Sequence, residues 1–189
     1  MNYLAHLFLA GDSAESMIGN LAGDFVKGPI HGDDAISAGI RKHRKIDAFT
    51  DAHPSVAAFR RVLIPDHGHY ARVIADVFFD HFLANDFGRY SSETLEAFVA
   101  RVHATLDLHA HELPGRLRVV YPYMRDQQWL LSYRSVSGIH LALTNLSRRL
   151  SRQPHLESAT NCLIDPRRRE LERRFHDFFP DLIEFSTTV

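Results

Sequence analysis

The chain has 189 residues, of which 45% are apolar and 24% charged, and its formal net charge is −1. This size and composition are those of one globular domain that needs no disulfides, and a net charge near zero excludes a general attraction to nucleic acid. The single cysteine, Cys162, excludes an internal disulfide and fits a reducing compartment. We interpret Cys162 as a small buried apolar residue.

The N-terminal segment MNYLAHLFLA is apolar but does not resemble a signal peptide, because it has no basic leading residues and His6 interrupts it. No run approaches the roughly 20 consecutive apolar residues that a membrane span needs. We therefore expect no membrane insertion and a cytoplasmic location. On pattern alone, His6 is more typical of a hydrogen-bonded core histidine than of a metal ligand.

Helix start and stop signals divide the first half of the chain. Asp12 and Glu15 have the spacing of a capping box for a helix that ends at Gly28-Pro29. Asp33 or Asp34 caps a second helix, which Pro54 closes. The remaining predictions are a short helix over 55–64 that ends at Pro65, a long helix over 69–86 that ends by Gly88, and a helix over 93–108 capped by Ser91 or Ser92.

Proline and glycine also divide the second half. Pro114-Gly115 marks a turn, and Pro122 should break or kink the segment 116–135. We expect a helix over 139–153 and, opened by Asp165-Pro166, a last helix over 167–179 that runs into Pro180. The sequence contains no strong strand alternation and no repeats. We predict one all-α domain over residues 1–189, a bundle of seven to nine helices.

One predicted helix carries His43, Asp47 and Asp51 at intervals of four residues, in HRKIDAFTD. Steps of roughly 40° place the three side chains on one face. Buried carboxylates need a positive partner, and a metal ion is the strongest one, so the pattern predicts metal ligands. A surface helix in which the two acids pair with Lys45 or Arg44 explains the same pattern equally well.

The next long helix adds Asp76, Asp80 and His81, in IADVFFDHFLAND. The surrounding apolar residues disfavour exposure of both acids. His81 is about 100° from Asp80 around the helix, and the two can still reach a pair of metals from its two flanks. The alternative is that Asp80 and His81 form a buried hydrogen-bonded pair.

Asn20 and Asp24 form another step of four, in GNLAGDFVKG. Gly19 and Gly23 are small enough to let another helix or a ligand approach closely. Asp24 lies in an apolar setting and also needs a partner, which makes it a further candidate ligand beside His6. Mixed carboxylate and imidazole ligands suit manganese, iron, zinc or magnesium, and the lack of cysteine argues against structural zinc. Such a metal activates water, so we expect hydrolytic chemistry.

Four blocks carry a family resemblance: MNYLAHLFLA, GNLAGDFVKG, GIRKHRKIDAFTDAHP and DVFFDHFL. With these blocks in this order, the chain resembles the bacterial acyl carrier protein phosphodiesterases. The resemblance continues, but is weaker, in QQWLLSYR and RRFHDFFPDL. The resemblance implies an all-helical fold distantly related to the HD-type phosphohydrolases. It also implies hydrolysis of the phosphodiester that joins 4'-phosphopantetheine to a serine of holo-acyl carrier protein, with manganese preferred and magnesium or iron as alternatives.

The resemblance also implies residue roles. The important aspartate of the family corresponds to Asp24, the H-R-x-I-D-x-x-T-D block to His43, Arg44, Ile46, Asp47, Thr50 and Asp51, and the DH pair to Asp80 and His81. The expected catalytic residues are Asp24, Asp80, His81 and Arg44. The expected metal ligands are drawn from His6, Asp24, His43, Asp47, Asp51, Asp76 and Asp80.

An acidic carrier protein should dock on basic residues near this site, for which the candidates are Arg41, Lys42, Lys45, Arg60 and Arg61. The C-terminal arginines at 167–169 and 173–174 fit a solvated helix face better. Two other functions stay open. One is an HD-type phosphohydrolase of nucleotides or small phosphodiesters, against which the lack of a glycine-rich phosphate loop counts. The other is a non-enzymatic helical binding protein with buried salt bridges.

Overall fold

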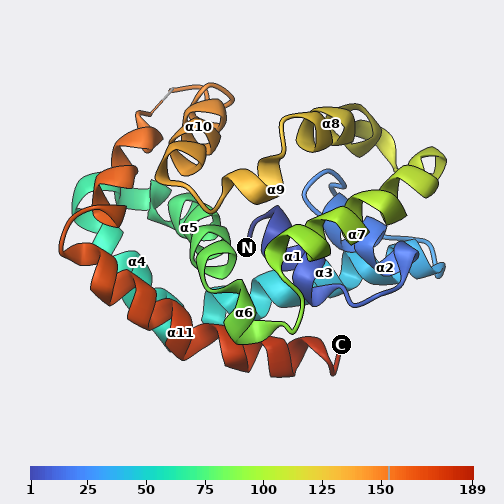
Figure 1. Cartoon of the computed structure of the whole chain (residues 1–189), viewed down its shortest axis with the longest axis horizontal. Helices are drawn as coiled ribbons and strands as arrows, with labels where there is room; N and C mark the ends of the chain where they lie inside the picture. The colour runs from blue at the N-terminus through green and yellow to red at the C-terminus, as the bar shows by residue number, and fades with distance from the viewer. Residues whose placement is uncertain (153) are drawn as a thin grey trace.

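The computed structural model describes residues 1–152 and 154–189, and every regular element within them is a helix (Figure 1). The α-helices are α1 (Tyr3–Leu9), α2 (Ala14–Ala22), α3 (Ala35–Ala52), α4 (Pro54–His67), α5 (Ala71–Asn85), α6 (Phe87–Tyr90), α7 (Leu95–Leu108), α8 (Gly115–Asp126), α9 (Trp129–Ser132), α10 (Val136–Ser147) and α11 (Arg167–Ser186). Short 3₁₀ helices cover Gly68–Tyr70, Ala110–Glu112 and Leu156–Leu163. The all-α prediction is confirmed, and nine of the α-helices in these ranges have seven or more residues.

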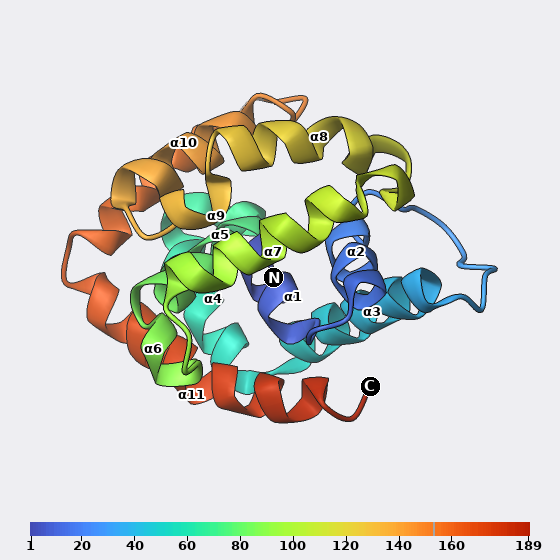
Figure 2. The ribbon, with the colours of Figure 1, turned by 45° about the vertical axis from the view of Figure 1, so that its right-hand side comes forward.

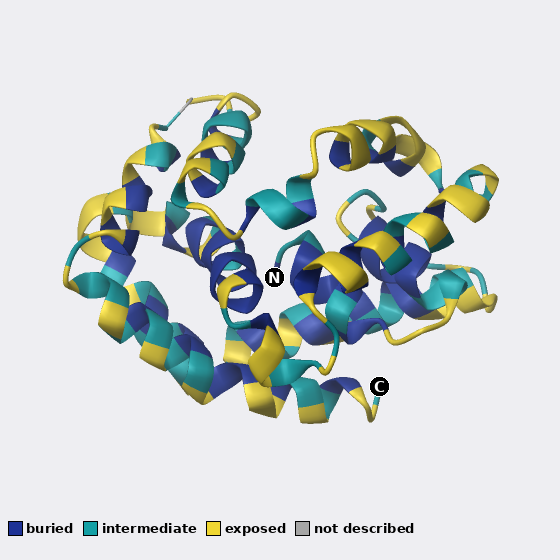
Figure 3. Ribbon diagram, in the orientation of Figure 1, coloured by how far each residue is buried: buried dark blue, intermediate teal, exposed yellow. Residues whose placement is uncertain are grey.

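Helix α5 forms the centre of the hydrophobic core, and Figure 3 shows most of it as buried. Its Phe79 and Phe82 contact Phe59 of α4 and Phe175 of α11, with ring centroids 4.8 to 6.2 Å apart. A helix that is covered on several sides must be apolar on most of its surface. The acids and the histidine that α5 carries therefore enter the interior.

Helices α2 and α3 pack closely because two glycines face each other. A β-carbon at Gly19 would lie 2.6 Å from the Cα atom of Gly39 and would also clash with the carbonyl oxygen of Ile36. Real β-carbons do not come this close, so a side chain at Gly19 would push the two helices apart. Gly19, which was predicted to let another helix approach closely, is where α3 packs against α2.

Helix α1 connects this pair to the core. It packs against α2 on one side and α5 on the other, and Figure 2 shows it between them. Leu4 and Leu7 are fully buried in these contacts. The short N-terminal helix is thus held inside the protein, and His6 on it faces the interior.

Two predicted helix caps are wrong. Ser13 caps α2 in place of Asp12, and Thr94 caps α7 in place of Ser91 or Ser92. In each case the capping side chain belongs to the last residue with extended backbone, and several neighbouring polar residues could have taken that position. The cap on α3 is Asp34, one of the two predicted residues. Helix α10 ends at Ser147, short of its predicted end, and residue 153 lies outside the described residues.

Several predicted helix ends are also wrong. Helix α2 stops at Ala22, before Gly28-Pro29, whereas α4 and α11 continue through Pro65 and Pro180. Pro122, which was predicted to break or kink its segment, lies inside α8 and does not break it. These helices continue although each proline removes one backbone hydrogen bond. Within the described ranges, no helix combines the length and the apolar character needed to cross a lipid bilayer.

Candidate metal centre

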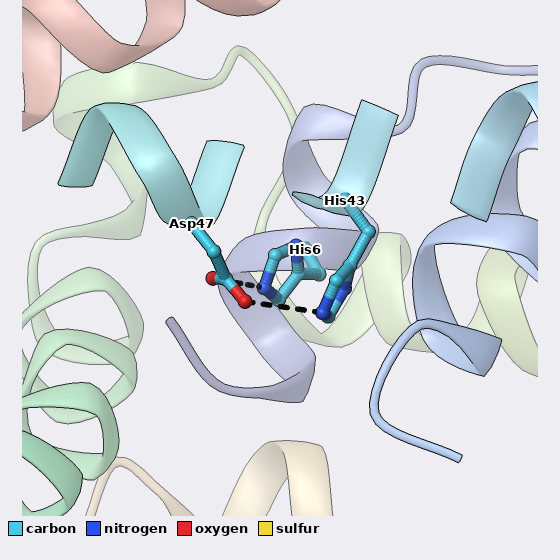
Figure 4. Close-up of side chains that lie close together, drawn as sticks. All are labelled: His6, His43 and Asp47. Carbon is cyan, nitrogen blue, oxygen red and sulfur yellow. Dashed lines mark hydrogen bonds and ion pairs between the residues drawn. The ribbon is translucent and has the colours of Figure 1, made fainter. Parts of the chain in front are cut away.

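Helices α1 and α3 bring two histidines and an aspartate together (Figure 4). Nε2 of His6 lies 3.2 Å from Oδ1 of Asp47, and Nε2 of His43 lies 3.2 Å from Oδ2 of the same carboxylate. One potential ligand atom from each residue lies within 4.8 Å of the other two. Both histidines are buried, whereas Asp47 is partly exposed. We call these three residues the His-His-Asp group.

The local structure explains this convergence. His43 and Asp47 are one helical turn apart on α3, so their side chains share a face, as their spacing predicts. His6 reaches them from α1, and its ring stacks on that of His43 with centroids 3.7 Å apart. The sequence pattern favoured a core histidine at position 6, and the fold makes His6 both buried and part of the candidate centre.

The imidazole of His43 is held in one orientation. Its Nδ1 donates to the carbonyl oxygen of Asn20 at 2.8 Å, and its ring lies so close to Gly23 that a β-carbon there would be 2.6 Å from Nδ1. Nε2 of the same ring points at two carboxylates, those of Asp47 at 3.2 Å and Asp24 at 3.6 Å. Ionised carboxylates cannot donate a hydrogen bond, so this approach is favourable only with a proton or a metal cation between the groups.

Asp24 lies at the solvent side of this centre, in the turn that follows α2, and its side chain is 41% exposed. Burial raises the pKa of this carboxyl, an effect that nearby His43 opposes and that the charges of Asp47 and Asp76 strengthen. A half-exposed acid with a raised pKa beside a histidine can both contact solvent and exchange a proton.

Asp76 of α5 reaches the same region from the opposite side. The buried Met1 ammonium lies 3.1 Å from Asp47 Oδ1 and 3.2 Å from Asp76 Oδ1. Burial lowers the pKa of the amine, but the two carboxylates outweigh this effect and raise it to about 10. A cation therefore already lies between these acids, which are placed to neutralise positive charge.

The donor set fits a divalent metal. Burial lowers the pKa of His6 to about 3, so its ring is neutral, and its buried Nδ1 lacks a hydrogen-bond partner among the described residues. Burial opposes ionisation of Asp47, but hydrogen bonds to the two histidines and the charge of the Met1 ammonium hold its pKa well below the usual range. The neutral imidazole of His6, the imidazole of His43 and the ionised carboxylate of Asp47 are ligand types that such metals bind.

Asp80 supports this centre indirectly. It is fully buried, and its two carboxylate oxygens accept hydrogen bonds from the backbone N–H groups of Leu4 and Ala5 at 2.9 and 3.0 Å. Burial raises its pKa to about 7 even though these bonds favour the ionised form. The acid thereby holds the first turn of α1, which carries His6, in place on α5.

The histidine next to Asp80 points elsewhere. Nδ1 of His81 donates to the carbonyl oxygen of Tyr133 at 2.8 Å, and the side chain of Asn85 lies alongside the ring. The 100° between consecutive helical residues sends Asp80 toward α1 and His81 toward the segment after α9. Asp80 and His81 thus do not form the buried pair that was the alternative to metal binding, and His81 lies outside the His-His-Asp group.

Asp51 also lies outside the group. Its carboxylate accepts a hydrogen bond from Arg60 of α4 at 2.8 Å and forms a second ion pair with Arg72 of α5. Each step of four residues turns the side chain by about 40°, and two steps from His43 bring Asp51 to face these arginines. Asp51 therefore forms salt bridges, as the alternative explanation of the pattern stated. Its partners are these two arginines and not Lys45 or Arg44.

The sequence profile of the acyl carrier protein phosphodiesterase family matches residues 1–182 of this chain. The chain belongs to this family. Members with that name include proteins from Serratia proteamaculans (33% identity, with 97% of this chain and 96% of the relative aligned), Photorhabdus laumondii (30%, with 97% and 94%) and Pectobacterium atrosepticum (30%, with 100% and 98%). No solved structure matches the chain. The resemblance inferred from the sequence blocks is thus confirmed.

In this member of the acyl carrier protein phosphodiesterase family, several basic candidates hold neighbouring segments. Arg41 donates to the carbonyl oxygen of Gly32 at 2.7 Å and Arg44 to that of Val26 at 3.1 Å, so both fix the loop that follows Asp24. Lys45 lies about 200° around α3 from both His43 and Asp47 and turns away from them. Together with Arg41 and Lys42 it lines a separate groove beside the C-terminus. Docking of a partner on Arg41, Lys42, Lys45, Arg60 and Arg61 stays a prediction.

Two other groups of potential ligands occur in the described residues: Asp66, His67 and Cys162, and Asp86, Glu172 and His176. Protein partners already account for them in part, because Asp66 pairs with Arg167 and His176 contacts both Tyr90 and Asp86. Sequence reasoning missed Tyr3 and Arg149, which lie together near Asp24. Tyr3 belongs to a family block, but nothing in the spacing around Arg149 distinguishes it from other surface arginines.

Proposed function

We propose that the chain hydrolyses the phosphodiester bond between 4'-phosphopantetheine and a serine of holo-acyl carrier protein, releasing apo-acyl carrier protein and 4'-phosphopantetheine. The observation that carries this proposal is the convergence of His6, His43 and Asp47, whose potential ligand atoms lie within 4.8 Å of one another, as the ligands of a metal do. Family membership supports the substrate. We assign the reaction to the cytoplasm, where the single buried Cys162 would stay reduced.

The centre fits a divalent metal, manganese first and magnesium or iron as alternatives. His6, His43 and Asp47 would hold it, with Asp24 and Asp76 as further oxygen donors. A bound metal would supply activation of water and neutralisation of the phosphate charge.

Asp24 is our candidate for proton transfer. Its partial exposure lets Asp24 meet incoming water, and its raised pKa makes it a stronger base than an ordinary aspartate. As the oxygen of water bonds to phosphorus, Asp24 takes the water proton. It returns that proton to the serine oxygen as the bond between phosphorus and that oxygen breaks, so the carboxylate ends the cycle unchanged.

Asp80 and Arg44 act as positioning residues in this scheme. Asp80 holds the turn of α1 that precedes His6 through two backbone hydrogen bonds. Arg44 holds the carbonyl of Val26, two residues after Asp24. Each fixes a segment that carries a proposed functional side chain, so their replacement should affect the centre by displacing that segment.

The test is a mass-spectrometric assay of holo-acyl carrier protein incubated with the enzyme, with and without manganese. We expect the carrier protein to lose the mass of the 4'-phosphopantetheine arm only when metal is present, and Asp24→Asn to abolish this loss while the helical circular dichroism persists. Intact holo-carrier protein after incubation with manganese-loaded wild type would refute the proposal. Purified protein without bound metal, unchanged in melting temperature by manganese, would favour the non-enzymatic alternative.

A further inference from the structure

A pocket beside the candidate metal centre is lined by residues of α5, α9 and α10 and by Asn2 and Tyr3 near the N-terminus. Figure 1 shows α5 and α9 close to the N-terminus. Its empty volume, which includes space open to solvent, is about 560 Å³. The lining residues relevant here are Asn2, Tyr3, Trp129, Leu141, Asn145 and Arg149.

The pocket lies beside the centre. Its wall includes Asn2, next to the Met1 ammonium that pairs with Asp47, and Val77, next to Asp76. Tyr3 connects the two regions: its ring stacks on that of Phe25, the residue after Asp24, with centroids 6.1 Å apart, and on that of Trp129 in the pocket. Burial raises the pKa of its phenol, the charge of Asp24 raises it further, and the charge of Arg149 opposes both.

The lining combines three kinds of contact. Trp129 and Leu141 offer apolar surface, with the ring of Trp129 stacked on that of Tyr3 at 6.2 Å between centroids. Asn145 and Asn2 offer amide groups that can both donate and accept hydrogen bonds. Arg149, which is exposed, is the only charged residue among the described residues of the lining.

We propose that this pocket binds the pantetheine arm of the substrate, with Arg149 beside the phosphate end and the helices α9 and α10 along the arm. The arm alternates methyl and methylene groups with two amides and carries a phosphodiester at one end, which matches the three kinds of contact. Because the pocket lies beside the centre, the phosphate would lie at the His-His-Asp group while the arm extends away from it. This inference rests on the proposed function, which supplies the substrate.

The test measures binding of 4'-phosphopantetheine by calorimetry in manganese-loaded protein. Two pairs of variants test whether the pocket takes part in this binding. Arg149→Glu reverses the charge in the pocket, and Arg148→Glu makes the same change on the exposed neighbour outside the lining. Ala142→Phe fills the pocket, and His140→Phe adds an aromatic ring to the exposed part of the same helix. Far-UV circular dichroism checks that all four variants fold.

We expect Arg149→Glu and Ala142→Phe to weaken binding of 4'-phosphopantetheine by at least about tenfold. Arg148→Glu and His140→Phe should bind it like wild type. Ala142→Phe should also weaken binding of pantetheine without its phosphate, while binding of inorganic phosphate stays unchanged. Equal affinities in both members of each pair, or no binding of 4'-phosphopantetheine by wild type, would overturn the assignment of the pocket.

The hydrolysis assay separates this inference from the proposed function. Pocket-dependent binding by a wild type that leaves holo-acyl carrier protein intact would support the pocket and refute the proposed function. Hydrolysis of holo-acyl carrier protein by Arg149→Glu and Ala142→Phe at the wild-type kcat/KM would support the proposed function and overturn the pocket.

Discussion

Nε2 of His43 lies 3.2 Å from Oδ2 of Asp47, one turn further along α3, while the other ring nitrogen donates to the carbonyl oxygen of Asn20 at 2.8 Å. A histidine that donates through one nitrogen can offer the other to a metal, and here the other nitrogen faces a carboxylate. The pair has the arrangement of two metal ligands, one of them oriented by the backbone of α2.

Asp47→Asn should remove metal binding and activity together, because an amide cannot supply the anionic oxygen that faces both histidines. We expect the turnover of holo-acyl carrier protein to fall by at least about 100-fold. Replacing a metal ligand should reduce activity more than replacing a residue that only orients a ligand. Metal content by elemental analysis and a single-turnover assay measure the two effects.

The matched control is Asp51→Asn, one turn further along α3. This change removes ion pairs with Arg60 and Arg72 but touches no residue of the His-His-Asp group. The free energy of unfolding should fall by less than about 1 kcal/mol, and manganese binding should stay at the wild-type level. Equal loss of metal in Asp47→Asn and Asp51→Asn would contradict the assignment of Asp51 to a structural ion pair.

Gly23→Ala should displace the His43 ring, since the added β-carbon would lie 2.6 Å from Nδ1 and closer to the ring carbons. Gly23 has helical backbone angles, so the effect comes from the contact and not from backbone strain. We expect manganese affinity to fall by roughly 10- to 100-fold, as for loss of a group that orients a ligand. Titration calorimetry with manganese gives the affinity. Gly88→Ala, where a β-carbon meets open space, should bind like wild type.

His81→Ala should destabilise the fold without removing the metal. The variant loses the bond from Nδ1 to the Tyr133 carbonyl and leaves a buried acceptor unpaired, which costs about 1–3 kcal/mol. Urea denaturation measures this loss, and the rise in melting temperature on adding manganese should match that of wild type. A stable His81→Ala variant that no longer responds to manganese would instead make His81 part of the metal site.

The helical period predicted part of this site and could not predict the rest. It correctly put His43 and Asp47 on one face, because that relationship lies within a single helix. The same period also included Asp51, whose partners Arg60 and Arg72 come from other helices and have no signature near it in the sequence.

Tertiary packing decides the other residues too. His6 lies in an apolar segment typical of a core histidine, and only the position of α1 between α2 and α5 brings it to Asp47. The adjacent Asp80 and His81 point to different helices for the same reason. The all-α class followed from caps and helix breakers, but the prolines inside α4, α8 and α11 show that a proline alone does not fix where a helix ends.

Asp80 should make stability depend on pH. Burial raises the pKa of its carboxyl to about 7 in the folded protein, against about 3.9 in an unfolded chain. Between these values the folded protein retains a proton that the unfolded chain has released. The folded state thus binds more protons, so the contribution of Asp80 to the free energy of unfolding falls as the pH rises from about 4 to 7.

The measurement compares metal-free wild type with Asp80→Asn, which cannot titrate, by urea denaturation from pH 5 to pH 8. The stability of wild type minus that of the variant should decrease steadily with pH and level off above about 7. His6 acts in the opposite direction: burial lowers its pKa to about 3, so its contribution is lost as the pH falls below its unfolded value. Because both proteins contain His6, its effect largely cancels in the difference. A difference that stays constant with pH would mean that Asp80 is ionised throughout, with its hydrogen bonds to Leu4 and Ala5 outweighing burial.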